Sequence, residues 1–335
     1  MHPALQGILT IVIGVSGCIG YFYFSNQLLD KVLFPNHGPN AGRNITRANM
    51  IRPWLFLFPA LAALGLYLAY PVFETIRLSL TERVPGGGSE FVGLANYRQM
   101  MDEPKFWEAM KNNMLWLIVV PALSTLFGLL AAQLSDRVRW GNIAKSLIFM
   151  PMAISFVGAA VIFKLVYDGR PIGQEQIGVL NAIYLYFGGD TPQNWLTIPL
   201  WNNFFLMIVL VWIQTGFAMV ILSAALRGIP EETIEAAIVD GANPFQVFFK
   251  IKVPQIMGTI VVVWTTITIV VLKVFDIVYA MTNGQWETQV LANYMYDKMF
   301  RANDWGVGSA SAMVIMLLVT PILVWNVYNA RKEMR

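Results

Sequence analysis

Residues 229–254 read IPEETIEAAIVDGANPFQVFFKIKVP, and they interrupt a chain that otherwise consists mostly of long apolar runs. Pro230 suits the first turn of a helix, because the N–H that proline lacks would have no partner there. The two glutamates that follow place negative charge at the positive end of the helix dipole. Ile234, Ala237 and Ile238 then recur at the spacing that puts residues on one helix face. The stretch therefore begins with a short amphipathic helix.

The second half of the stretch predicts a turn and another helix. Gly241 suits the positive φ that often ends a helix, and Asn243-Pro244 forms a cap followed by a first-turn proline. The new helix carries three phenylalanines along one side, namely Phe245, Phe248 and Phe249. Protruding aromatic side chains suit a pocket on a partner protein. The same pattern also fits an interfacial loop whose phenylalanines enter lipid.

The composition of the whole chain indicates a membrane protein. Hydrophobic residues make up 56% of the 335 residues and charged residues 13%, whereas soluble domains carry about a quarter charged residues. The formal net charge of +3 is too small to indicate a nucleic-acid partner, and the single cysteine excludes an internal disulfide. Seven apolar runs reach the roughly 20 residues that a membrane helix needs, at 5–24, 53–73, 114–134, 143–167, 199–226, 256–280 and 307–327.

These runs predict an all-α, polytopic membrane protein of about seven transmembrane helices. We expect residues 1–52 to form an extra N-terminal helix with a linker, and residues 53–335 to form a core of six helices with a helix–turn–helix loop at 227–255. Lysine and arginine are more frequent in the segments that become cytoplasmic if the N-terminus lies outside. The predicted topology therefore has the N-terminus outside, and the C-terminus and the 227–255 loop in the cytoplasm.

Several polar residues fall within or near the predicted spans, where such groups usually face a cavity or the bundle interior. Gln214 lies in the middle of a span, and Asn202 and Asn203 lie near its outer end. Lys273 and Asp276 lie three residues apart in the next span and would share a helix face. Each of these groups fits either a solute pathway or a structural contact between helices, and the residues alone leave both readings open.

The central stretch resembles the signature of permeases in ATP-binding-cassette (ABC) importers. The similar positions are Glu235-Ala236-Ala237, Asp240-Gly241-Ala242, Phe248, Ile251 and Pro254. The segments RPWLFLFPALAALGLYLAYPVFETIRLSL (52–80), FVGLANYRQMMDEPKFWEAMKNNM (91–114) and KVFDIVYAMTNG (273–284) are similar to carbohydrate-uptake permeases, especially the larger subunit of the maltose and α-glucoside branch. Three departures leave the sugar itself open, namely a short outer loop at 74–113, the sequence Gln285-Trp286-Glu287-Thr288, and one N-terminal helix fewer than the maltose subunit has.

The resemblance implies specific roles for residues of this chain. It implies that the loop docks on an ATPase subunit through Glu235, Ala236, Ala237, Asp240, Gly241, Phe245, Phe248 and Phe249. It implies sugar contacts at Leu210, Ile213, Gln214, Phe217, Val271 and Val274. Trp286 and Trp305 fit a contact with a binding protein or an interfacial aromatic belt.

The implied function is that of a permease subunit of a binding-protein-dependent sugar importer in the inner membrane. The resemblance implies ATPase subunits that hold ATP and Mg, a second permease, and an extracytoplasmic sugar-binding protein. No cofactor is expected in this chain itself, because it has no phosphate-binding lysine motif. A permease for peptides or amino acids is the nearest alternative, and an ion-coupled transporter using Lys273 and Asp276 is another. With only two histidines and no catalytic cluster, the sequence gives little support to an enzyme.

Overall fold

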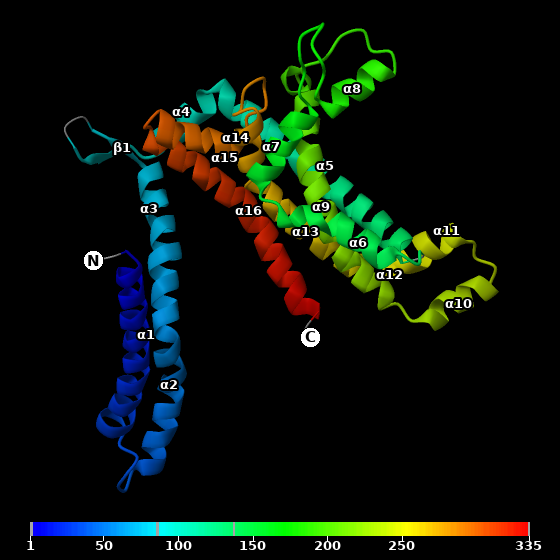
Figure 1. The fold of residues 1–335 in the computed structure, drawn as a ribbon. Coiled ribbons are helices and arrows are strands. Elements are labelled where there is room, and N and C mark those ends of the chain that lie inside the picture. The colour runs from blue at the N-terminus through cyan, green and yellow to red at the C-terminus, as the bar shows by residue number, and fades with distance from the viewer. Residues whose placement is uncertain (1–2, 85–86, 137, 334–335) are drawn as a thin grey trace. The chain divides into compact units, whose positions relative to one another are not determined.

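Helices account for nearly all the regular structure in the computed structural model, which describes residues 3–84, 87–136 and 138–333 (Figure 1). The predicted all-α fold is confirmed. Contacts between residues divide the chain into two units, Met1–Glu74 and Thr75–Arg335. The predicted boundary between residues 52 and 53 follows the apolar runs in the sequence and not the contacts between residues, so it stays a prediction.

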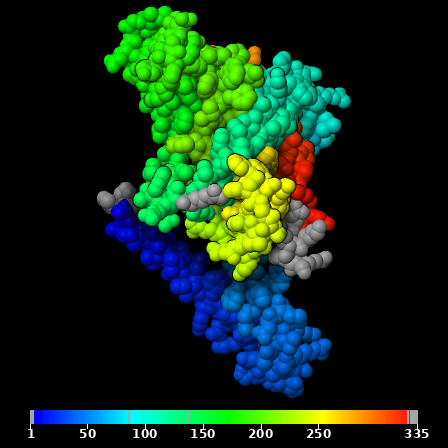
Figure 2. Space-filling view, turned by 90° about the vertical axis from the view of Figure 1, so that its right-hand side faces the viewer, coloured from blue at the N-terminus to red at the C-terminus, as the bar shows by residue number. Residues whose placement is uncertain are grey.

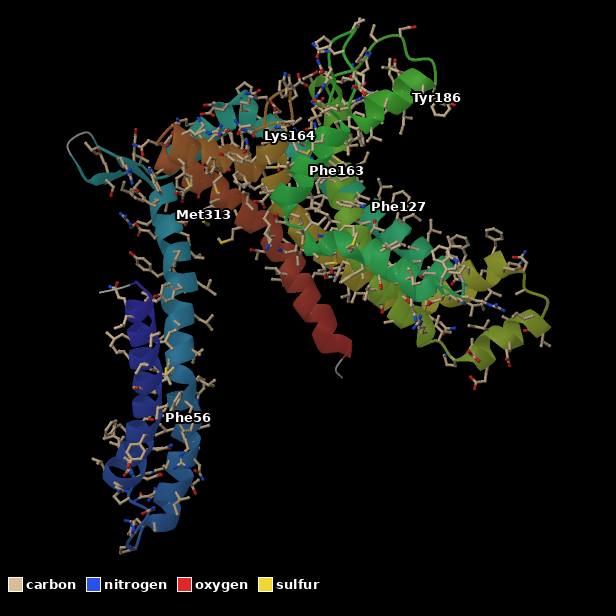
Figure 3. The ribbon with its side chains drawn as sticks, in the orientation of Figure 1. Phe56, Phe127, Phe163, Lys164, Tyr186 and Met313 are labelled. Atoms are coloured by element: carbon tan, nitrogen blue, oxygen red, sulfur yellow. The ribbon has the colours of Figure 1, made fainter. Side chains whose placement is uncertain are left out.

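The first unit is a pair of long helices lying side by side (Figure 1). Its elements are α1 (Pro3–Gln27), the π-helical turns η1 (Leu28–Leu33) and η2 (Gly65–Ala69), α2 (Ala41–Leu64) and the start of α3 (Tyr70–Ser79). The Tyr21 hydroxyl donates to the Leu55 carbonyl at 2.8 Å, and the rings of Phe22 and Phe56 lie 5.3 Å apart; Phe56 is labelled in Figure 3. Most apolar side chains on both helices are exposed, so the pair offers its surface to lipid or to other protein.

The core of the second unit is formed by helices that are far apart in sequence. The long ones are α5 (Pro104–Ser135), α9 (Trp201–Arg227), α13 (Met257–Leu272) and α16 (Trp305–Glu333). α9 is the most enclosed of the five unbroken apolar helices, with 61% of its most apolar window buried. Trp116 of α5, Leu210 of α9 and Ile267 of α13 are almost completely buried. The side chains of α9 are therefore held mainly by this chain's own helices.

Two predicted spans are not straight helices. The run at 143–167 consists of α6 (Gly141–Phe149), the 3₁₀ turn η3 (Met150–Ala153) and α7 (Phe156–Val166), with a bend of 104°. The predicted span at 256–280 begins with α13, which meets the preceding loop helix, Pro244–Gln255, at an angle of 70°. The described part of the chain thus has five unbroken apolar helices, or up to seven spans if each bent pair counts as one.

The prediction of one span over 256–280 is wrong in detail. α13 ends at Leu272, and α14 (Asp276–Met281) starts after a break of three residues. Phe275, in this break, has φ −138° and ψ −57°, outside the helical region. The apolar run alone gave no sign of this break.

Short elements cover the end of the second unit that lies opposite the 227–255 loop (Figure 1). They are the antiparallel strands β1 (Thr81–Arg83) and β2 (Ser89–Phe91), with α4 (Ala95–Asp102), α8 (Val179–Tyr186), the 3₁₀ turn η4 (Trp195–Thr197), α14, α15 (Leu291–Tyr296) and the π-helical turn η6 (Asp297–Arg301). Tyr186, at the end of α8, is 86% exposed (Figure 3).

Candidate functional site

The turn in the middle of the 227–255 loop is closed by backbone hydrogen bonds. Gly241 follows α10 (Glu231–Val239) with a φ of +84°. The Ala242 N–H donates to the Ala237 carbonyl at 2.9 Å, and the Gly241 N–H donates to the Ile238 carbonyl at 3.0 Å. Together these bonds form a Schellman motif, in which the residue at the Gly241 position is left-handed. The predicted helix stop with positive φ is confirmed.

The second helix of the loop begins with the predicted cap. It consists of α11 (Pro244–Gln246), the π-helical turn η5 (Val247–Lys252) and α12 (Val253–Gln255). The Gln246 N–H donates to Asn243 Oδ1 and the Asn243 N–H donates to Gln246 Oε1, both at 2.9 Å. This reciprocal pair is a capping box. The turn is therefore fixed on both sides, by the Schellman motif before it and by the capping box after it.

The three phenylalanines of the second helix do not all project, which corrects the prediction. Phe245 and Phe249 are 76% and 62% exposed, whereas Phe248 is 9% exposed and belongs to the main apolar core. Val247 beside it is also buried. The helix needs an apolar stripe to attach to the bundle, and Val247 and Phe248 provide it. Phe248 therefore attaches the helix to the bundle instead of projecting from it.

The exposed apolar side chains of the loop form a surface that we call the loop face, consisting of Ile238, Val239, Phe245 and Phe249. The loop faces the viewer in Figure 2, where it is drawn in yellow. A cavity of about 260 Å³ lies between the two helices and is lined by Ile234, Ile238, Ala242, Pro244, Val247, Phe248 and Lys252. Glu235, Ala236 and Asp240 are exposed around it, and Ala237 is buried.

An ion-pair cluster anchors the end of α9, where the loop begins. Asp136 follows α5 and accepts hydrogen bonds from Arg227 at 2.7 and 3.0 Å, and it also pairs with Lys145 of α6. Partial burial raises the pKa of Asp136, but the hydrogen bonds from Arg227 and Lys145 lower it more, so that its pKa lies below the usual 3.8. The charged carboxylate thus holds the ends of α5 and α9 and the start of α6 together.

The predicted sugar-contact residues come together where α9 meets α13. Leu210, Ile213, Val271 and Val274 are buried in the main core, and Phe217 packs against it half-buried. Gln214 is 6% exposed, and its amide has no hydrogen-bond partner among the described residues. The alternative for Gln214, a hydrogen bond between helices, is therefore not formed among the residues that the structure describes. In this conformation the residues pack against each other.

Lys273 and Asp276 do not share a helix face, because the break after α13 separates them. Lys273 is exposed and Asp276 half-buried, and no ion pair joins them in the part of the chain described. This arrangement removes the geometric basis for treating the two residues as a paired ion-coupling site.

Comparison with known proteins identifies the family. Residues 124–333 match the family described as "Binding-protein-dependent transport system inner membrane component". The chain belongs to this family. It is therefore a permease subunit of an ABC importer, and a transport protein rather than an enzyme. This membership supports the importer interpretation over an ion-coupled transporter.

Two relatives of the permease and one solved structure extend the comparison. The "Alpha-glucoside transport system permease protein AglF" of Rhizobium meliloti is 64% identical over 99% of both chains. The "Osmoprotective compounds uptake permease protein GgtC" of Synechocystis sp. is 47% identical over 84% of this chain and 100% of the relative. A bacterial ABC transporter involved in the import of the acidic polysaccharide alginate has a chain of the same fold, with a TM-score of 0.72, 20% identity, and coverage of 88% of this chain and 99% of that one.

Buried asparagines hold a strained loop of the permease at the end opposite the loop face. Trp286 and Glu287 have φ of +54° and +62°, values that are uncommon for such residues. Asn202 donates to the Trp286 carbonyl at 2.6 Å, and Asn112 and Asn203 donate to the Glu287 carbonyl at 2.9 and 3.2 Å. These bonds stabilise a conformation that would otherwise be unfavourable. Trp286 remains 47% exposed.

The sequence pointed to Asn202 and Asn203 but not to Asn112 of α5, which binds the same loop. The signal was present, because the chain carries two adjacent asparagine pairs, at 112–113 and 202–203. Asn113 accepts the Leu291 N–H at 2.8 Å. Both pairs are buried and bind the backbone between α14 and α15, which gives these amides a structural role.

Proposed function

We propose that this permease imports α-linked glucosides. The observation that carries the proposal is the 64% identity to an alpha-glucoside transport permease along almost the whole of both chains. Sugar contacts would come from Leu210, Ile213, Gln214, Phe217, Val271 and Val274 in an open conformation. The half-buried Phe217 ring suits the apolar C–H face of a sugar, and the unpaired Gln214 amide suits a sugar hydroxyl.

The proposal includes the partners that the sequence predicted. ATPase subunits would hold ATP and Mg, and one of them would dock on the loop face. A second permease would complete the pathway, and an extracytoplasmic binding protein would deliver the sugar. The family description supports a binding protein. The four exposed apolar side chains of the loop face support docking, because exposed apolar patches commonly mark protein contacts.

Transport would proceed by alternating access. Closure of the ATPases would move α10 and the helix after it as a unit, since the turn at Gly241 is fixed on both sides. The ion pairs at Asp136 and the buried Phe248 would pass this movement to α9 and α13. Rigid-body rocking of these helices would then open the packed residues around Gln214 to the sugar.

A reconstituted complex tests the proposed function. With its ATPase, second permease and binding protein in proteoliposomes, the permease is expected to take up maltose or a related α-glucoside only when ATP is enclosed. Cellobiose is the control for the linkage, since it is the β-linked isomer of maltose, and a dipeptide is the control for the peptide alternative. Uptake of the dipeptide without uptake of any α-glucoside would favour the peptide permease instead.

The proposed topology predicts opposite labelling of two equally exposed sites. Tyr186 on α8 and Val239 on α10 are 86% and 87% exposed and lie beyond opposite ends of α9. In a Cys18→Ser background, an impermeant thiol reagent added outside intact cells should label Tyr186→Cys but not Val239→Cys. Cys18 must be replaced because it is exposed. The reverse labelling pattern would invert the proposed orientation.

The proposed sugar contacts predict a loss of transport without a loss of assembly. Phe217→Ala removes a ring that could stack on the sugar. Gln214→Leu replaces the amide by an apolar side chain of similar volume. Each variant is expected to lower the uptake rate about 5- to 30-fold at saturating loaded binding protein. Val220→Ala, an exposed residue of the same helix, is the control. Unchanged rates in both variants would move the sugar site to the second permease.

A further inference from the structure

A row of aromatic rings runs along the end of the second unit opposite the loop face. It is formed by Phe275, Tyr279, Tyr296, Phe300 and Trp305, called the ring row below. Phe275 precedes α14 as its cap, and its carbonyl accepts the Tyr279 N–H at 2.9 Å, whereas Tyr296 and Phe300 lie four residues apart across α15 and η6. Their side chains therefore meet as two facing i, i+4 pairs, and Trp305 begins α16.

The spacing of the rings is nearly even. Neighbouring centroids are 5.0 Å apart for Phe275 and Tyr279, 5.3 Å for Tyr279 and Tyr296, and 5.2 Å for Tyr296 and Phe300. Trp305 follows Phe300 at 5.6 Å. The row is thus unbroken, with centroid separations in the range of direct aromatic contacts.

Charged and polar groups line the same row. The Arg301 guanidinium lies 5.5 Å from the Tyr279 ring and 5.7 Å from the Tyr296 ring, and Arg83 lies 4.7 Å from the Trp305 ring. Arg301 is held by Asp297 at 3.0 Å and by the Asn283 side chain at 2.9 Å. Fixed cations beside rings supply directional hydrogen-bond donors next to apolar faces.

The row is accessible and reaches the proposed sugar contacts. Phe300 is 58% and Tyr279 37% exposed, so these rings are not core residues. At its other end Phe275 adjoins Val274, and a cavity of about 360 Å³ opens beside Phe275, Tyr296 and Lys273. The row therefore runs from the exposed Phe300 ring to Phe275, the residue that directly follows the proposed sugar contact Val274.

We propose that the ring row is a path of stacking sites for the glucosyl units of the substrate, between the binding protein and the membrane core. The inference rests on the proposed function. A pyranose ring has apolar C–H faces and a rim of hydroxyls, and the row offers rings for the faces and guanidinium, carboxylate and phenol groups for the rim. A lipid chain would match the rings but leave the fixed arginine and aspartate groups without a function.

The test compares loss of a ring with exchange of a ring. Tyr296→Ala and Phe300→Ala are expected to lower the uptake rate of an α-glucoside about 3- to 10-fold at saturating loaded binding protein. Tyr296→Phe and Phe300→Tyr keep the rings and should stay within about two-fold of wild type. Tyr186→Ala, an exposed aromatic residue outside the row, is the matched control and should have no effect.

A second measurement separates sugar stacking from binding-protein docking. The concentration of loaded binding protein that half-saturates the ATPase rate should be the same in wild type and in the alanine variants. An increase in this concentration with an unchanged maximal uptake rate would show a protein-docking surface and overturn the proposal. So would equal losses in the alanine and ring-exchange variants. If the wild-type complex takes up no α-glucoside at all, the proposed function fails rather than the ring row.

Discussion

Gly241→Val is expected to weaken ATPase association about 5- to 30-fold while the permease still inserts in the membrane. The glycine has a φ of +84°, and an added Cβ would meet no atom within 4 Å. The effect therefore comes from the backbone, since left-handed geometry costs an L-residue roughly 1–2 kcal/mol and suits valine particularly poorly. If valine shifts Gly241 out of this region, the Schellman turn opens and α10 loses its fixed angle to the second helix.

Two further variants make this expectation specific to the turn. Gly241→Asn should have an intermediate effect, because asparagine enters the left-handed region more readily than valine. Gly228→Ala is the control from the same loop, because Gly228 has a φ of −78° and the added Cβ would lie 3.4 Å from the nearest atom. The measurement is co-purification of the ATPase, together with binding-protein-stimulated ATP hydrolysis. Equal association for valine, asparagine and glycine at position 241 would show that the turn geometry is not used in docking.

The sequence predicted the loop well because its signals are local. A glycine stop, an asparagine cap and a first-turn proline act within a few residues, and the structure confirms each of them at Gly241, Asn243 and Pro244. Phe248 was misplaced because the side that a helix buries depends on the bundle it packs against. Helical spacing alone placed Phe248 with Phe245 and Phe249, but the bundle takes Phe248 together with Val247.

The elements opposite the loop face were the hardest to predict. Apolar composition identifies a run that can cross a membrane, but it does not show a break such as the one after Leu272 or the bend between α6 and α7. Contacts with residues far away in the sequence hold these helices in place. Lys164 of α7, for example, donates to the Ala280 carbonyl of α14 at 3.3 Å. The proposed sugar contacts were predictable only through the resemblance, because buried valines and leucines have no pattern that separates a pathway from a core.

Gly128→Ala is expected to lower the thermal transition of the purified permease by roughly 2–10 °C. The Cβ added at Gly128 would collide with the Ala218 Cβ and would lie 2.9 Å from the Met219 backbone nitrogen, so one helix must move. Ser124, Gly128 and Ala132 recur every four residues on α5, and all three are buried. Small residues at this spacing let membrane helices approach closely. Gly65→Ala, where nothing lies within 4 Å of the new Cβ, is the control and should keep the transition or raise it slightly, because alanine suits a helix better than glycine.

The double variant Gly128→Ala/Ala218→Gly decides whether the loss comes from this contact. Ala218→Gly alone should lower the transition slightly, because glycine in a helix costs roughly 1 kcal/mol relative to alanine. Combined with Gly128→Ala it removes the shorter of the two clashes, so the double variant should be more stable than the sum of the single losses predicts. Recovery will be incomplete, because the Met219 nitrogen still lies 2.9 Å from the added Cβ. Strictly additive losses would mean that α5 and α9 adjust freely at this crossing. A crossing that adjusts freely could not carry movement from the loop face to Gln214 as the proposed mechanism requires.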